Sequence, residues 1–145
     1  MPTALDVANF FLSKTREDIG DSITHLKLQK LVYYAQGIYL AMKGVPLFED
    51  HIEAWDHGPV VPTLYRNFRE YGSNPIPGTD ANEAEMPFDE SQIEILNEVY
   101  KAYGQYSAWK LRAMTHDEPT WKNAYPNGVI DNDSMMSFFK TQIEE

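Results

Sequence analysis

The chain has no cysteine, few basic residues and no apolar run long enough to cross a membrane. Without cysteine, disulfides, thiolate metal sites and cysteine nucleophiles are excluded. A membrane-spanning helix needs about 20 consecutive apolar residues, and the apolar stretches here are shorter. The first residues also lack the basic start of a secretory signal. We therefore expect a cytoplasmic protein with no membrane partner.

Acidic residues clearly outnumber basic ones. The 22 Asp and Glu stand against 12 Lys and Arg, which gives a formal net charge of −10. Phosphate backbones are bound by clustered Lys and Arg, so this excess disfavours nucleic acid as a partner. It favours a basic protein partner, because opposite charge speeds encounter, although solubility alone would also account for it.

Sequence motifs that carry catalysis are missing as well. There is no GxxxxGK phosphate loop, no GxGxxG, no GxSxG and no HExxH. A hydrolytic metal needs about three converging His or carboxylate ligands, whereas the histidines here are spread along the chain. His116 and Asp117 are adjacent, so on a helix they point in different directions. We predict no enzyme, no cofactor and no metal site; the least favoured alternative is a metal-dependent hydrolase using His51, Asp56, His57 or His116.

Apolar residues at helical spacing mark the element around which we expect the fold to form. In the stretch Ile23–Gly44 they recur every three or four residues, which indicates one helix face, and further apolar side chains widen that face. Thr24 suits the N-cap, and Gly44 suits the left-handed residue that ends a helix. Gly37 lies mid-helix, which indicates close packing against a neighbour, with a hinge as the alternative.

Further helices are predicted on both sides of this central one. Their expected ranges are 3–14, 62–71, 89–103, 107–116, 118–125 and 131–144. Ile52–Trp55 has the pattern of a short extended segment, and Gly58-Pro59 has that of a turn. Ser73–Pro87 is predicted to be a long acidic loop, and residues 18–22 a shorter loop. The prediction is one mainly α domain over residues 1–145: a compact bundle of about six or seven helices around the central helix, with a short β segment near residues 51–56 as an option.

The predicted helix 89–103 carries an acidic face. Glu90, Glu94 and Glu98 repeat every four residues, and no Lys or Arg lies between Arg69 and Lys101. Like charges four residues apart weaken a helix slightly. The face is therefore a candidate for contact with a basic partner.

Three ordered blocks of the sequence resemble the Panacea domain, also described as the SocA-like or GepA-like phage-associated domain. They occupy residues 27–48, 53–72 and 106–125, and the resemblance covers about residues 4–126. The residues that carry it are Lys27-Leu28-Gln29-Lys30-Leu31, Ala54-Trp55-x-x-Gly58-Pro59-Val60-Val61 and Leu111-x-x-x-Thr115-His116-x-x-x-x-Trp121.

The resemblance implies an antitoxin of a bacterial or phage toxin–antitoxin pair, which neutralises its cognate toxin by direct protein contact, and it implies no enzymatic activity. The alternative function is an adaptor that delivers a bound partner to a protease through residues 73–87 or 143–145. The sequence leaves the toxin and the oligomeric state open. The Met- and Phe-rich last helix could cover the core or meet a second chain.

We assign candidate partner-binding residues to three places, because aromatic residues dominate protein interfaces while charges at the rim steer association. These places are the flank of the central helix, where we expect an exposed tyrosine, the turn after the extended segment, and the acidic face. The residues are Lys27, Lys30, Tyr33 and Tyr34; Trp55, Asp56, His57 and Val60; and Glu90, Glu94 and Glu98. Further residues of the blocks are assigned to the fold: Leu28, Leu31, Gly58, Pro59, Trp109, His116 and Trp121.

Overall fold

The computed structural model describes residues 1–15, 22–79 and 82–143. Within these ranges it contains seven α-helices: α1 (Ala4–Leu12), α2 (His25–Lys43), α3 (Pro62–Phe68), α4 (Glu90–Tyr103), α5 (Ala108–His116), α6 (Pro119–Ala124) and α7 (Asn132–Ile143). Short strands and 3₁₀ turns connect them: β1 (Ile23–Thr24), β2 (Ile52–Trp55), β3 (Gly58–Val60), β4 (Pro75–Ile76), β5 (Val129–Ile130), η2 (Arg69–Tyr71) and η3 (Glu83–Glu85). The mainly α fold predicted from the sequence is confirmed.

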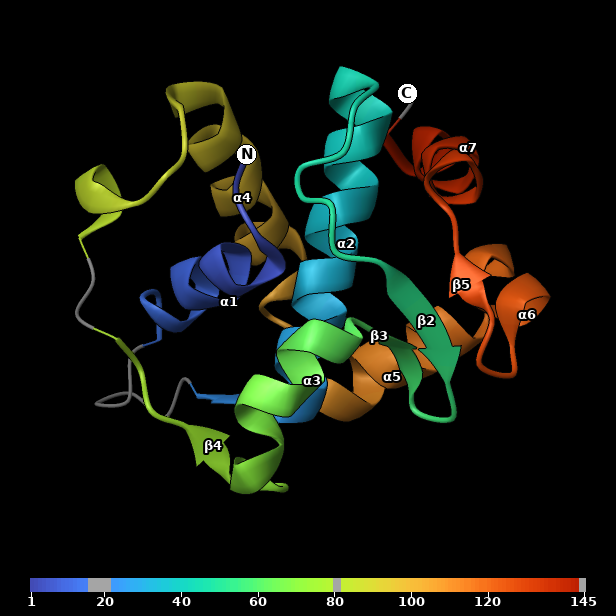
Figure 1. Cartoon of the computed structure of the whole chain (residues 1–145), viewed down its shortest axis with the longest axis horizontal. Coiled ribbons are helices and arrows are strands. Elements are labelled where there is room, and N and C mark those ends of the chain that lie inside the picture. The colour runs from blue at the N-terminus through green and yellow to red at the C-terminus, as the bar shows by residue number, and fades with distance from the viewer. Residues whose placement is uncertain (16–21, 80–81, 144–145) are drawn as a thin grey trace.

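Helix α2 lies at the centre, and α1, α4, α5 and α7 all pack against it (Figure 1). Every residue from Lys27 to Leu40 is buried. The hydroxyl of Thr24 accepts a hydrogen bond from the backbone N–H of Lys27, and Gly44 ends the helix with φ 75°. The predicted caps and the central position of this helix are therefore confirmed.

Gly37 is the point of closest approach between α2 and α7. A Cβ atom at Gly37 would overlap the edge of the ring of Phe139, which is fully buried. The close-packing interpretation of this glycine is therefore confirmed. Met135 and Phe139 bury one side of α7 against the core.

Side-chain caps also begin four other helices. Thr3 forms a capping box at the start of α1, and Asp89 forms another at the start of α4. Ser107 accepts a hydrogen bond from the N–H of Lys110, and Asp131 accepts one from Ser134. These caps depend on residues three apart in the chain, so the sequence alone reveals them.

A three-stranded antiparallel sheet in the order β3-β2-β5 lies beside α5 and α6 (Figure 1). Ile52–Trp55 is extended as predicted, but Gly58-Pro59 is not the turn. Asp56 and His57 form a two-residue turn, and Gly58 opens β3 with φ 114°. Proline has no N–H to donate, and β3 is an edge strand, where such a residue is tolerated.

The predicted loop 73–87 is only partly irregular. Residues 75–76 form β4, which pairs with β1, and 83–85 form η3. The ammonium of Lys14 contacts the Glu83 carboxylate at 2.7 Å. The loop predicted at 18–22 lies mostly outside the described residues. No helix in the described ranges is both long and apolar enough to span a bilayer.

Candidate functional site

The hairpin formed by β2 and β3 is held from the side of α2 by two buried polar side chains. The ammonium of Lys30 donates a hydrogen bond to the carbonyl oxygen of Pro59 at 3.1 Å. The amide of Gln29 accepts from the N–H of Val61 at 2.9 Å and donates to the carbonyl of the same residue at 3.4 Å. Unpaired buried backbone groups are costly, so these bonds fix where the hairpin leaves the core.

Two further side chains hold the hairpin from the side of α5 and α6. The indole nitrogen of Trp121 donates to the carbonyl oxygen of Trp55 at 2.9 Å. The Nε2 atom of His116 lies 2.8 Å from the carbonyl oxygen of Asp56. The three blocks of the sequence, far apart along the chain, therefore meet at this hairpin.

Gly58 is required here both by its backbone conformation and by lack of space. Its φ of 114° is one that L side chains rarely adopt. A Cβ atom would lie 2.6 Å from Cε of Lys30 and 2.9 Å from Oγ1 of Thr115. The glycine thus lets α2 and α5 approach the hairpin from both sides.

A pocket of about 470 Å³ opens beside the hairpin, within the size range of about 300–1,000 Å³ that ligand sites occupy. The rings of Trp55 and Tyr65 lie 5.1 Å apart, and Tyr65 also lies 5.2 Å from the ring of His25. Five of the predicted partner-binding residues contribute to the lining, namely Lys30, Trp55, Asp56, His57 and Val60. The structure thus brings all four residues predicted at the turn together with Lys30 around one cavity.

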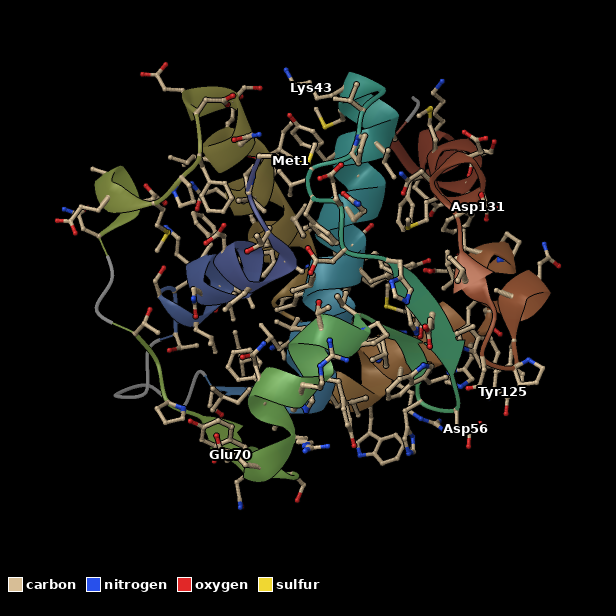
Figure 2. All side chains as sticks on the ribbon, viewed as in Figure 1. Met1, Lys43, Asp56, Glu70, Tyr125 and Asp131 are labelled. Atoms are coloured by element: carbon tan, nitrogen blue, oxygen red, sulfur yellow. The ribbon has the colours of Figure 1, made fainter. Side chains whose placement is uncertain are left out.

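Exposed side chains extend this pocket along a rim. The Nε–H of Arg112 donates to Nδ1 of His57 at 3.1 Å, and the guanidinium lies 5.1 Å from the ring centroid of Trp109, which is 67% exposed. Near the hairpin tip, the hydroxyl of Tyr125 donates to Asp56 at 2.6 Å (Figure 2). We call this surface the hairpin face; it comprises Trp55, Asp56, His57, Tyr65, Arg69, Trp109, Arg112 and Tyr125 around the pocket.

The expectation of an exposed contact row on the central helix is wrong. Lys27 is 8% exposed, and Lys30, Tyr33 and Tyr34 are at 0–1%. Their polar ends reach across to other elements instead: Lys27 donates to the carbonyl of Gly104, and both tyrosines donate to the carboxylate of Glu118. Five helices and strand β3 pack against α2, so its polar side chains find partners inside the protein.

Glu118 is the buried acid that this arrangement creates. Burial raises its pKa to about 7, although the hydrogen bonds from Tyr34 and Tyr33 oppose the rise. The ring of Tyr34 is stacked on Tyr103 at 4.0 Å. Sequence reasoning took Glu118 only as the start of a helical turn, because nothing near it in the chain reveals its two tyrosine donors.

Two basic side chains in the pocket lining, Lys30 and His25, have pKa values below their usual ones. Burial lowers the pKa of Lys30 to about 7, and the charge of Arg112 adds to the effect. Burial also lowers the pKa of His25 to about 4, with a smaller contribution from Lys30. At neutral pH His25 is therefore uncharged.

Trp109 was assigned to the fold, and this too is wrong. Leu111 and Thr115 occupy the buried side of α5, and Trp109 points to solvent. Four hairpin-face residues were not predicted from the sequence: Tyr65, Arg69, Arg112 and Tyr125. Spacing was the available signal for the first three, since Tyr65 and Arg69 are four residues apart and Arg112 follows Trp109 by three.

Glu90, Glu94 and Glu98 are exposed on α4, which lies across α2 from the hairpin (Figure 1). The acidic face and the hairpin face are therefore separate surfaces. Among the described residues, no three His, Asp or Glu side chains are placed to hold a metal ion.

Comparison with known proteins identifies the family. A family model described as "Antitoxin SocA-like, Panacea domain" matches residues 28–122, which include the hairpin, α5 and Trp121. The chain is also similar to Antitoxin SocA of Caulobacter vibrioides (strain NA1000 / CB15N), with 34% identity over 119 residues. This alignment covers 76% of the chain but 63% of the relative, so the chain spans less than two thirds of the relative's length. No solved structure matches significantly.

Proposed function

The chain belongs to the SocA-like Panacea family of antitoxins, and from that premise we propose that it neutralises a cognate protein toxin by direct binding through the hairpin face. We choose this surface because it presents the exposed side chains of Trp109 and Arg69 beside a hairpin whose backbone is already held in place by hydrogen bonds. Trp, Tyr and Arg are the residues that contribute most to protein interfaces. A surface ordered before binding loses less conformational entropy when the complex forms.

The polar groups around the hairpin support binding over catalysis. Lys30, His116 and Trp121 each direct a nitrogen at a backbone carbonyl of the hairpin. The Nδ1 atom of His57 accepts from Arg112. Side chains that could transfer a proton are thus engaged in holding the surface, and neutralisation by contact requires no more than that surface.

Co-expression with the product of the neighbouring gene tests this function. The wild-type chain should relieve growth arrest caused by that product and form a stable complex with it in size-exclusion chromatography. Trp109→Ala should weaken relief, because it removes the most exposed aromatic ring of the hairpin face. Lys122→Ala, an exposed residue of α6, is the control and should protect as well as the wild type. Unrelieved arrest together with no complex would reject the proposal.

Delivery to a protease is the second candidate, and one feature favours it. In the described part of the connection between η2 and α4, most residues are exposed and only β4 and η3 are regular. Such a segment is accessible to degradation machinery. The half-life of the bound partner in cells separates the two functions, since sequestration leaves it long and delivery shortens it. A stoichiometric metal in the purified protein would instead revive a hydrolase.

A further inference from the structure

Basic side chains gather at the hairpin face without carboxylate partners. Lys30 donates only to a backbone carbonyl, Arg112 to His57, and Arg69 lines the pocket with no ion pair among the described residues. The chain as a whole has a net charge of −10, so acidic side chains are abundant elsewhere. Asp56, the carboxylate in the pocket lining, accepts a hydrogen bond from Tyr125. The two guanidinium groups without a carboxylate partner in the described ranges, those of Arg69 and Arg112, therefore lie on the same face as the exposed ring of Trp109.

The guanidinium of Arg112 is held in an orientation that suits the binding of a carboxylate. The ring of Trp109 lies against the guanidinium, and Nε–H is bonded to His57. The terminal N–H groups have no partner among the described residues. A guanidinium fixed in this way presents a planar edge that matches the two oxygens of a carboxylate.

The pocket supplies a complementary apolar feature. Trp55 and Tyr65 form an aromatic wall, and Val60 lies beside them in the lining. His25, at the same site, is neutral at neutral pH because burial lowers its pKa to about 4. An apolar side chain can therefore enter the pocket while charged neighbours remain at the rim.

We propose that the hairpin face receives an acidic segment of the neutralised protein, whose Asp or Glu carboxylates pair with Arg112 and Arg69 while an adjacent apolar side chain occupies the pocket and packs against the wall formed by Trp55 and Tyr65. This inference rests on the proposed function, and it adds the chemistry of the partner. Nucleic acid fits less well, because one exposed and one half-buried arginine on a chain of net charge −10 are far from the clustered basic surface that phosphates require.

The test uses the full chain and the partner protein from the co-expression experiment, with association and dissociation measured by surface plasmon resonance. R69E/R112E should weaken binding by about ten-fold or more, mainly through faster dissociation, because each introduced glutamate would face a partner carboxylate of like charge. K101E/K140E reverses two exposed lysines on α4 and α7 and changes the net charge equally. This matched control should stay within about two-fold of the wild type.

Two further measurements complete the design. Circular dichroism melting of both variants separates lost contact from lost folding, since the substituted arginines and lysines lie at the surface or its rim. Hydrogen exchange on the partner should show protection of a segment rich in Asp or Glu, and replacing its acids with Lys should restore binding to R69E/R112E.

The possible outcomes are distinct. If R69E/R112E is folded and binds as tightly as K101E/K140E, the acidic-segment inference is overturned and the antitoxin function stands. If the wild-type chain binds no neighbouring product, both are rejected. If labelled single-stranded DNA binds the wild type but not R69E/R112E, the surface recognises nucleic acid instead and the inference is again overturned.

Discussion

The indole nitrogen of Trp121 donates a hydrogen bond to the backbone carbonyl oxygen of Trp55, 2.9 Å away. This bond joins α6 to β2, two elements from different blocks of the family pattern. Trp121 is only 9% exposed, whereas Trp109 is 67% exposed and stacks with Arg112. The two tryptophans of the third block therefore have different roles, one holding the hairpin and the other extending its surface.

Replacing each tryptophan with phenylalanine should separate these roles. Trp121→Phe leaves the carbonyl of Trp55 without its donor and should lower the free energy of unfolding by about 1–3 kcal/mol. Trp109→Phe removes no hydrogen bond and should change it by less than about 0.5 kcal/mol. Urea unfolding of the two variants measures both values. Equal losses would contradict this assignment.

Glu118 should make stability depend on pH in a predictable direction. Its pKa in the folded chain, about 7, lies above the usual 4.5, so the folded chain holds this proton more tightly than the unfolded chain does. The stabilisation is complete below pH 4.5 and is lost as the pH rises to about 7. Glu118→Gln stays neutral, so over this window the variant should gain about 3 kcal/mol relative to the wild type.

The comparison of wild type with E118Q cancels the other groups that titrate in the same window. The most important is His25, whose lowered pKa makes stability rise with pH between about 4 and 6.5 in both proteins. Urea unfolding at several pH values gives the difference directly. Parallel pH profiles for the two proteins would show that Glu118 does not retain its proton in the fold.

The parts of the fold that could be predicted from the sequence are those set by interactions between residues close together in the chain. Helix α2, its caps at Thr24 and Gly44, and the close contact at Gly37 were all predictable, because periodicity and capping act over a few residues. The two-residue strands were not, since pairs such as β1 with β4 have no repeating pattern.

The errors at the candidate site have the same origin. Tyr33 and Tyr34 looked available for a partner because their acceptor, Glu118, lies about 85 residues away in the chain. Trp109 looked like a core residue because a helix of nine residues does not reveal which of its apolar side chains faces solvent. A long-range hydrogen bond decides the first case and the packing of α5 against distant elements decides the second, and neither has a local signature.

Lys30 should respond to pH in the direction opposite to Glu118. Its pKa in the folded chain, about 7, lies below the usual 10.5, so burying the ammonium is most costly below pH 7 and the cost disappears as the pH rises towards 10.5. Lys30→Met removes this cost together with the hydrogen bond to Pro59. The variant should be more stable than the wild type by about 1–3 kcal/mol at pH 6, because an apolar replacement of a buried charge is often stabilising.

That gain should shrink when unfolding is measured near pH 9, where the wild-type lysine is already neutral in the fold. Lys43→Met is the control, since Lys43 is exposed at the far end of α2 (Figure 2). Its effect should be small and the same at both pH values. A gain for K30M that does not change with pH would mean that packing, and not charge, sets the stability at this position.

The acidic face of α4 is expected to affect how fast the partner arrives. Glu90, Glu94 and Glu98 are exposed and lie across α2 from the hairpin face, so they can attract a basic surface of the toxin without taking part in the hairpin contact. Replacing all three with Lys should slow association by about three- to ten-fold at low ionic strength. The difference should fade at about 0.5 M salt, where screening reduces the range of surface charges to a few ångströms, and dissociation should change little.

Two variants of equal total charge separate the effect of the acidic face on the association rate from the effect of the net charge of the chain. E94K/E98K and E49K/D133K change the total charge equally and all four positions are exposed, but only the first pair lies on the acidic face. Stopped-flow association at low and high salt should slow only for E94K/E98K. Equal slowing of both pairs would assign the effect to the overall charge of the chain, and an unchanged rate for E94K/E98K would remove this face from the encounter while leaving binding at the hairpin face intact.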